Sequence, residues 1–234
     1  MNLQEWIKKG KPINSIVCCD CLEGMKQMED NSVDLILTDP PYNINFKPQR
    51  GTFDGIENDN KSWEEFNKFM QPIMNECFRV LKNGSVAYFF TGFSSSSAFY
   101  QYAIKAGFNV KCQIVWVKNN FGTGYHFRPQ HEDIWCCFKG RPHVPEKAIS
   151  SVIFEKKVNG VDLLHSCEKP VNLLKILLKQ YTKMNSLIFD PFMGVGSTAI
   201  AAKETNNNFI GFEIDEEYYK SSLKRIGEQT HSFW

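Results

Sequence analysis

The sequence predicts a doubly wound α/β fold, in which a mostly parallel sheet is covered by helices on both faces. Short apolar runs alternate with helical patterns along nearly the whole chain. Hydrophobic residues make up 42% of the chain, which is enough for a core on both faces of a sheet. The length of 234 residues suits one domain, so we predict that residues 1–234 form a single domain.

The first half of the chain contains four apolar runs typical of strands and three segments with helical spacing. Asp20 and Ser62 are predicted N-caps, and Glu65 completes a capping box with Ser62. Asn83-Gly84 is predicted to end the second helix. The expected order is strand 15–18, helix 21–28, strand 33–38, helix 62–81, strand 85–91, helix 95–105 and strand 109–117.

The second half continues the alternation after two loops that lack a regular period, at 43–61 and 119–131. Residues 139–165 show no strong pattern. The expected order is strand 132–138, helix 170–181, strand 186–189, helix 197–205, strand 208–214 and a final helix to about 226.

Composition excludes several classes of protein. No apolar run reaches the length of a membrane span, and the first residues lack the apolar region of a signal peptide, so we expect a cytoplasmic protein without a membrane anchor. The eight cysteines should then be reduced thiols. Their spacing matches no zinc motif, and no metal site is expected.

The net charge of +1 is unevenly distributed along the chain. Residues 105–183 hold 13 Lys and Arg against 6 Asp and Glu, whereas the flanking parts are both acidic. A positive middle third suits a protein that contacts phosphates through one region, although a solvated surface with uneven charge would look the same.

A buried strand at 186–189 runs into a glycine loop, Asp190-Pro-Phe-Met-Gly194-Val-Gly196, and then into a helix. The next strand ends at Glu213, where an acidic side chain can accept hydrogen bonds from ribose hydroxyls. The pattern predicts a nucleoside cofactor. Because only 21 residues follow Glu213, and because Asp190 suits a cationic ligand better than a pyrophosphate, S-adenosylmethionine is favoured over NAD.

A second loop, Asp39-Pro40-Pro41-Tyr42, follows the predicted strand 33–38. An exocyclic amine on a base is a poor nucleophile, because its lone pair is delocalised into the ring. The Asp39 carboxylate and the Pro40 carbonyl could accept hydrogen bonds from both N–H groups and free that lone pair for attack on a methyl group. Tyr42 could stack on a base outside the duplex. Alone, the same four residues could be a capped turn.

The order of these motifs resembles the β group of DNA amino-methyltransferases, in which the catalytic motif comes first and the cofactor motif last. Further matches are Asp20-Cys21, Trp116-Val117-Lys118, Phe127-Arg128-Pro129 with His131-Glu132, and His165 with Lys169-Pro170. The resemblance covers nearly the whole chain. It implies a Rossmann-like methyltransferase sheet with a small inserted DNA-recognition region, and a chain that methylates DNA.

The resemblance also implies which residues form the site. Asp39, Pro40 and Tyr42 would be catalytic. Asp20 and Cys21 would lie near the adenine of S-adenosylmethionine, and Glu213 would bind its ribose. The methionine part and ribose would be surrounded by Lys169 and by the loop that contains Asp190, Phe192, Gly194, Gly196, Ser197 and Thr198.

Relatives with Asp-Pro-Pro-Tyr usually methylate adenine N6 and those with Ser-Pro-Pro-Tyr cytosine N4, so Asp39 favours adenine at a specific sequence and cytosine is the alternative. One departure is His165-Ser-Cys-Glu-Lys169-Pro, where relatives more often have His-Pro-Thr-Gln-Lys-Pro. A non-catalytic nucleic-acid-binding module and a nicotinamide oxidoreductase remain as readings from other classes.

The recognition loops are expected at 43–61 and 119–165. Six basic residues in or beside them are candidate contacts to phosphates or bases: Arg50, Lys118, Arg128, Lys139, Arg141 and Lys147. DNA is the expected partner. A homodimer and a cognate restriction endonuclease are further partners that the sequence leaves open.

Overall fold

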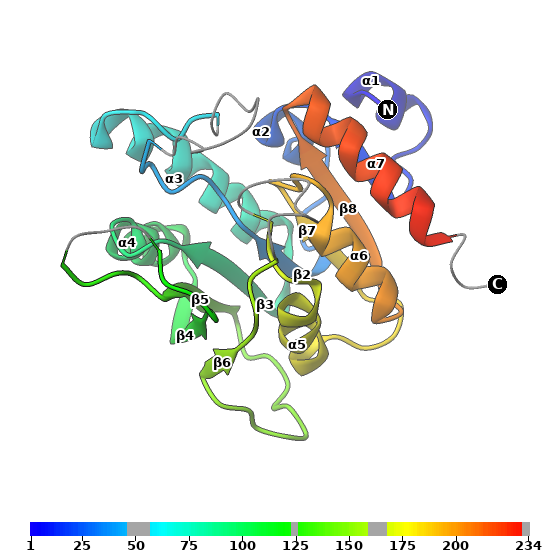
Figure 1. Ribbon diagram of the computed structural model, residues 1–234. Coiled ribbons are helices and arrows are strands. Elements are labelled where there is room, and N and C mark those ends of the chain that lie inside the picture. Colours follow the sequence, from blue (N-terminus) through cyan, green and yellow to red (C-terminus); the bar gives the residue numbers. More distant parts are fainter. Residues whose placement is uncertain (46–56, 123–125, 159–167, 231–234) are drawn as a thin grey trace.

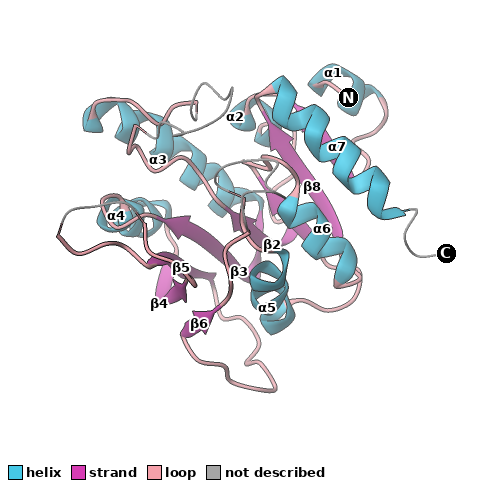
Figure 2. Ribbon diagram, viewed as in Figure 1, coloured by secondary structure: helices cyan, strands magenta, loops and turns pink. Residues whose placement is uncertain are grey.

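The computed structural model describes residues 1–45, 57–122, 126–158 and 168–230, with side chains as far as residue 227. These residues form one eight-stranded sheet in the order β1-β8-β7-β2-β3-β5-β4-β6 (Figure 2). The strands are β1 (Ser15–Cys18), β2 (Val33–Thr38), β3 (Leu81–Thr91), β4 (Asn109–Val117), β5 (His131–Lys139), β6 (Val152–Phe154), β7 (Leu187–Asp190) and β8 (Asn208–Glu213).

Within the described sheet, β5 runs antiparallel to its neighbours β3 and β4, and the other strands are parallel to one another. The chain passes from β2 to β3 in one direction along the sheet, and from β7 to β8 in the other. The strand order therefore reverses between β2 and β7. This topology confirms the predicted doubly wound, mostly parallel fold.

The helices lie in two layers on either side of the sheet (Figure 1). They are α1 (Leu3–Lys8), α2 (Cys21–Met25), α3 (Trp63–Val80), α4 (Ser96–Ala106), α5 (Val171–Tyr181), α6 (Ser197–Glu204) and α7 (Glu216–Thr230). Helices α1 to α4 share one core cluster with Ile36 of β2, whereas α5 and α6 share a second cluster with Leu35 and Leu37, against which α7 also packs. Adjacent residues of β2 thus pack on opposite faces of the sheet, because successive side chains of a strand point to alternate faces.

Local signals explain most of the element ends. The Asp20 side chain accepts hydrogen bonds from the backbone N–H groups of Leu22 and Glu23, and Ser62 and Glu65 form the predicted capping box. The seven cysteines in the described part of the chain are free thiols, and four of them are buried. No helix among the described residues combines the length and apolar composition that crossing a bilayer requires.

Three details differ from the sequence prediction. Asn83-Gly84 does not end α3, because the helix already ends at Val80 and Leu81 begins β3. Gly84 has a φ of 80° and lies where the pairing with β2 shifts, so it forms an irregularity inside the strand instead. The short elements α1 and β6 were missed, since six and three residues are too few to show a clear period.

Gly24 gives a test of the packing between α2 and β8. A Cβ at this position would come within 2.6 Å of the ring of Phe212, which is completely buried. Alanine usually favours a helix by about 1 kcal/mol over glycine, but overpacking a core costs about 1–3 kcal/mol. We expect Gly24→Ala to lower the free energy of unfolding in urea. The control is Gly227→Ala in α7, where no atom lies within 4 Å of the added Cβ. If both variants were as stable as the wild type, this close packing would be disproved.

Candidate functional site at the carboxyl edge of the sheet

The neighbouring strands β2 and β7 end side by side at the carboxyl edge of the sheet. Beyond these ends the chain continues to α3 on one face and to α6 on the other (Figure 1). Ligands bind at such a reversal of strand order in open α/β sheets. The Thr38 hydroxyl donates a hydrogen bond of 2.7 Å to Asp190 Oδ1 and joins the two strand ends. The Asp39 loop and the glycine loop are therefore neighbours.

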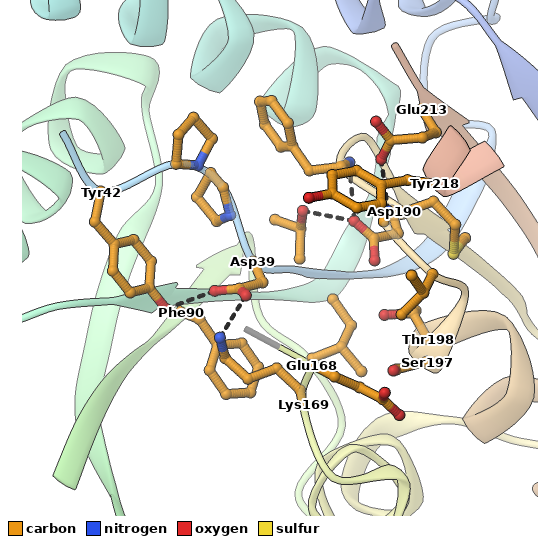
Figure 3. Close-up of a pocket in the computed structure, with 18 of the residues that line it drawn as sticks. Asp39, Tyr42, Phe90, Glu168, Lys169, Asp190, Ser197, Thr198, Glu213 and Tyr218 are labelled. Atoms are coloured by element: carbon orange, nitrogen blue, oxygen red, sulfur yellow. Dashed lines mark hydrogen bonds and ion pairs between the residues drawn. The ribbon is translucent and has the colours of Figure 1, made fainter. Parts of the chain in front are cut away.

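A cavity of about 280 Å³ occupies this crevice (Figure 3). Its volume is near the lower end for small-molecule sites. The predicted site residues that line it are Asp39, Pro40, Tyr42, Lys169, Asp190, Phe192, Gly194, Ser197, Thr198 and Glu213. Its apolar wall includes Leu37, Phe90, Trp116 and Leu174, which were not predicted because buried strand and helix residues carry no local sign of a ligand.

Asp39 follows β2 directly and is held from two sides (Figure 3). Its Oδ1 accepts a hydrogen bond of 2.5 Å from the Tyr42 hydroxyl, and its Oδ2 forms an ion pair with Lys169 Nζ. Burial raises the pKa of the Asp39 carboxyl, and the positive charge of Lys169 opposes this rise. The carboxylate is thus placed in a partly enclosed cavity with a cation beside it.

The loop after Asp39 is fixed by Asp59, which is buried and was not predicted as part of the site. Asp59 Oδ1 accepts hydrogen bonds of 3.0 Å from the backbone N–H of Tyr42 and 3.2 Å from that of Ile44. The Tyr42 ring in turn lies over Gly92, just beyond β3, where a Cβ would come within 3.0 Å of the ring. The position of Tyr42 is therefore set by its backbone as well as by its hydroxyl.

Glu132, at the start of β5, connects Asp39 with two lysines. It forms ion pairs with Lys118 and, at 3.3 Å, with Lys169, and it accepts a hydrogen bond of 3.3 Å from the Tyr42 hydroxyl. Burial would raise the pKa of the Glu132 carboxyl, but the charges of Lys169 and Lys118 outweigh burial and lower the pKa to about 2. Glu132 thus stays ionised at the wall of the cavity and is paired with both lysines.

The glycine loop has a backbone conformation that requires glycine at two positions. Gly194 and Gly196 have φ angles of 54° and 86°, in the left-handed region that favours glycine. A Cβ at Gly194 would meet no atom within 4 Å, so the backbone there borders open space in the cavity. The Gly194 N–H donates a hydrogen bond of 2.7 Å to Glu213 Oε2, and the Phe192 N–H donates one of 3.0 Å to Asp190 Oδ1.

Two carboxyls in the glycine-loop half of the site have raised pKa values. Burial raises the pKa of Asp190 to about 6, although Thr38, Thr198 and the Phe192 N–H donate hydrogen bonds to it. Burial also raises the pKa of Glu213 to about 7, against hydrogen bonds from two backbone N–H groups. Raised carboxyl pKa values of this kind are common at catalytic and ligand-binding sites.

Glu168 and Arg225 also belong to this region, and no local pattern pointed to them. Arg225 of α7 forms an ion pair with Glu168 Oε1 and donates a hydrogen bond of 3.0 Å to Ser197 Oγ, which braces the glycine loop. Glu168 Oε2 is buried and has no hydrogen-bond partner among the residues that the structure describes. With Glu168 the cavity is lined by carboxylates on several sides, an arrangement that fits a ligand with positive charge.

Three predicted cofactor residues do not line the cavity. Gly196 caps the start of α6. Asp20 uses its side chain to cap α2, and Cys21 is buried in the core beneath it. The chain before Asp20 nevertheless runs beside the end of β8. There the Cys19 N–H donates a hydrogen bond of 3.0 Å to the Glu213 carbonyl. Asp20 and Cys21 therefore lie at the same edge of the sheet as the glycine loop, with β8 between them.

The predicted DNA contacts are divided between the two edges of the sheet. Because β5 is antiparallel, Lys139 lies at the amino edge, where its Nζ donates hydrogen bonds to the carbonyls of Phe78 and Leu81. Arg141 and Lys147 lie in the connection from β5 to β6, which begins and ends at that same edge. These three residues therefore lie away from the cavity, and DNA contacts by them stay predictions that the structure does not bring to the site.

The other candidates lie nearer the cavity or cannot be placed. Lys118 is at the carboxyl edge, but its side chain is only 18% exposed and is paired with Glu132, which lines the cavity; a DNA contact by Lys118 stays a prediction. Arg128 is exposed at the carboxyl edge and remains a predicted contact. Arg50 lies outside the described residues.

Comparison with known proteins connects this site with a family. Residues 33–224 match the sequence model of a family described as DNA methylase. The match begins at β2 and ends in α7, and it includes both the Asp39 loop and the glycine loop.

Two curated relatives align with this chain over most of the length of both proteins. The Escherichia coli (strain K12) protein YubD is 33% identical over 208 residues, which cover 88% of this chain and 87% of YubD. A second protein of that strain, described as DNA adenine methyltransferase YhdJ, is 25% identical over 95% of this chain and 85% of its own.

Solved structures share the fold. The complex of M1.HpyAVI with SAM has a TM-score of 0.71 at 24% identity and covers 91% of this chain and 98% of its own. The cytosine-N4-specific PvuII DNA methyltransferase has a TM-score of 0.71 at 18% identity and covers 90% and 85%. The chain belongs to the DNA methylase family of S-adenosylmethionine-dependent enzymes that methylate an exocyclic amino group, N6 of adenine or N4 of cytosine, in DNA.

Proposed function

We propose that this enzyme methylates N6 of adenine within a specific DNA sequence, and that the target adenine leaves the duplex to enter the cavity. The observation that carries the proposal is the position of the Asp39 carboxylate, at the end of β2 and beside the glycine loop in one cavity. An acceptor for the target amine and the loop that binds the methyl donor must be neighbours for an in-line transfer.

Asp39 and Pro40 would activate the target amine. The amine presents two N–H groups, and acceptors on both would draw the nitrogen towards a tetrahedral shape and free its lone pair. The Asp39 carboxylate is one acceptor, and Lys169 favours its ionised form despite burial. We assign the second to the Pro40 carbonyl, because two consecutive prolines restrict the backbone there. The incoming N–H would replace one of the two groups that now contact the Asp39 carboxylate, the Tyr42 hydroxyl or Lys169 Nζ.

Tyr42 would hold the face of the flipped base. Its ring lines the cavity, and its hydroxyl is fixed by Asp39 and Glu132. Extracting a base costs about a few kcal/mol, and stacking on a fixed aromatic ring offsets part of this cost.

The other half of the cavity would hold S-adenosylmethionine, which supplies an electrophilic methyl group on a sulfonium centre. Its two positive charges match the carboxylates of Asp190 and Glu168, and Gly194 leaves open space for close approach. We assign the ribose hydroxyls to Glu213, the methionine part to Lys169 and the glycine loop, and the adenine to the neighbourhood of Asp20 and Cys21.

Cytosine N4 methylation is the second candidate. The PvuII enzyme, whose description is cytosine-N4-specific, has the same fold, so the fold does not favour either base. Asp39 in place of serine supports adenine, as does the description of YhdJ as an adenine methyltransferase.

Two alternative functions, in other classes of protein, predict different experimental results. A nicotinamide oxidoreductase would be stabilised against heat by NAD and not by S-adenosylhomocysteine. A non-catalytic nucleic-acid-binding module would bind S-adenosylhomocysteine and DNA without modifying the DNA. The Asp39 loop and the glycine loop share one cavity, which supports an enzyme over both readings.

The test is a product analysis. Purified protein, unmethylated DNA of varied sequence and isotope-labelled S-adenosylmethionine are incubated, and the DNA is digested to nucleosides for mass spectrometry. We expect labelled N6-methyladenine. Labelled N4-methylcytosine would replace the proposal with the second candidate, and unlabelled DNA would overturn catalysis on DNA. Sequencing of the modified positions would give the recognition sequence.

We further propose that residues 43–61 and 119–165 contain the recognition elements, with Arg128 as a DNA contact at the cavity edge. A homodimer, a cognate restriction endonuclease and a cytoplasmic location stay predictions from the sequence.

A further inference from the structure

The connection between β4 and β5 forms a braced hairpin beside the cavity. We call the described residues of this connection, 118–122 and 126–131, the rim hairpin. Lys118 and Gln130 are joined by two hydrogen bonds, Lys118 N–H to the Gln130 carbonyl at 2.8 Å and Gln130 Nε2 to the Lys118 carbonyl at 3.0 Å. Further out, the Gly122 N–H donates a hydrogen bond of 2.6 Å to the Pro129 carbonyl. The described part of the rim hairpin is therefore an ordered extension of the sheet.

Both ends of the rim hairpin lie next to Glu132, a residue of the cavity wall. Its first residue, Lys118, is ion-paired with Glu132, the residue that follows its last, and Glu132 lines the cavity beside Asp39. Figure 1 shows the chain between β4 and β5 extending beyond the end of the sheet. The hairpin is therefore next to the cavity. A DNA duplex whose base enters the cavity would lie against the hairpin.

Exposed phenylalanines are concentrated at the same edge of the sheet. Phe127 of the rim hairpin has a relative exposure of 101%, the full value for an extended chain. The other exposed phenylalanines among the described residues are Phe93, Phe121 and Phe154. Phe93 follows β3 and Phe154 ends β6, so all four lie at the carboxyl edge. Clusters of exposed apolar side chains mark binding surfaces.

A cation accompanies the aromatic side chains. The Arg128 guanidinium lies over the Phe121 ring, 5.6 Å from its centroid, and its Nε donates a hydrogen bond of 2.7 Å to the Gly122 carbonyl. Arg128 is exposed, so its remaining N–H groups face solvent at the edge where DNA must approach. An aromatic ring beside an exposed guanidinium suits a partner with stacked bases and phosphates.

We propose that Phe127 inserts into the DNA duplex and takes the stacking position of the base that enters the cavity, while Arg128 contacts a nearby phosphate. The inference rests on the proposed function, because it requires the target base to leave the duplex. Apolar side chains that enter a base step can hold it unstacked. Phe127 is suited to this because it is fully exposed on a braced hairpin whose ends lie next to Glu132, a residue of the cavity wall.

The first test measures DNA binding and does not depend on methylation. Wild type and Phe127→Ala are titrated, with S-adenosylhomocysteine, into two fluorescent duplexes that differ only in one abasic site. The abasic gap accepts an aromatic ring without displacing a base, so we expect the wild type to prefer it by about tenfold or more. Phe127→Ala should bind both duplexes equally. Absence of a preference in the wild type, or its persistence in the variant, would overturn the proposal.

Phe154→Ala is the matched control, since Phe154 is also a phenylalanine, is 77% exposed and lies at the same edge on β6. It should keep the preference for the gap. Neither ring is buried, so thermal unfolding should be unchanged in both variants. If Phe127→Ala instead altered the oligomeric state, Phe127 would belong to a contact between two copies of the chain and the insertion would be excluded.

The second test uses the methylation site found by product analysis. On a fully paired duplex Phe127→Ala should lower kcat/KM by about 10- to 100-fold, and an abasic position opposite the target should restore most of it. An equal loss on both substrates would exclude a role in opening the duplex. If no methylation is found but the gap preference follows Phe127, the insertion stands and the proposed function falls. If Phe127→Ala methylates DNA at the normal rate, the proposed function stands and the insertion falls.

Discussion

Asp39→Ala should reduce methyl transfer to DNA by about 10²- to 10³-fold or more, the loss typical of a fixed polar group that acts in the transition state. The variant removes the acceptor for the target amine and one of the two carboxylates paired with Lys169, whose side chain is 7% exposed. It does not touch the glycine loop, so binding of S-adenosylhomocysteine should stay close to the wild-type value. Single-turnover transfer of a labelled methyl group and calorimetric binding separate the two effects.

Two further variants control this prediction. Asp39→Asn keeps the shape but not the charge, and it should be nearly as inactive as Asp39→Ala. Asp34→Ala removes another paired carboxylate from the same strand, at the amino end of β2, where Asp34 bonds to Lys82 and to the Leu187 N–H. We expect lower stability but a normal rate from Asp34→Ala. An active Asp39→Ala variant would refute the proposed activation of the amine.

Glu213→Ala should weaken the binding of S-adenosylhomocysteine by about 10- to 100-fold, because hydrogen bonds to a charged group contribute about 1.5–3 kcal/mol each. Glu213 lines the cavity and its Oε2 is bonded to the Gly194 N–H, so the ligand would meet a carboxylate already held in place. Isothermal calorimetry gives the affinity. Glu216→Ala, an exposed acid three residues further along, is the control and should bind normally.

The raised pKa of Glu213 adds a pH dependence. Burial raises this pKa to about 7 in the free protein, so the carboxyl is largely protonated below pH 7 and must lose its proton to accept two hydroxyl hydrogen bonds. The affinity for S-adenosylhomocysteine should therefore fall as the pH drops from 8 to 6, and Glu213→Gln should flatten this dependence. For stability the sign is opposite: a raised pKa favours the folded ligand-free protein below about pH 4.5, and this contribution is lost as the pH rises through about 7. A pH-independent affinity in the wild type would contradict the assigned role of Glu213.

The sequence predicted most of the fold because β2, β7 and β8 are continuous apolar runs and α3 has a clear N-cap. It could not reveal that β5 is antiparallel, since the direction of a strand depends on its partners and not on its own residues. The direction of β5 explains why Lys139 and Arg141, which were predicted beside the target site, lie at the edge opposite the cavity. It also explains why Glu132, at the start of a predicted strand, was not expected beside Asp39 at the end of another.

The candidate site could be predicted where function is concentrated in contiguous residues, as in Asp39 to Tyr42 and in the loop from Asp190 to Thr198. Asp59 and Arg225 lie far from these loops in sequence, and they reach the site only through tertiary packing. Their residue types are common on protein surfaces, and only their burial and hydrogen bonds distinguish them.

The hydrogen bond between Thr38 and Asp190 joins residues 152 positions apart, and it has a consequence for how the enzyme is made. During synthesis β2 leaves the ribosome long before its neighbour β7, so the growing chain carries the Asp39 carboxylate on a strand with one side still unpaired. The glycine loop is reached only 152 residues after Thr38. A chain that stops short of β7 therefore has the residues for chemistry but no neighbouring strand to form the cavity, and it would be a target for quality control and not a partly active enzyme.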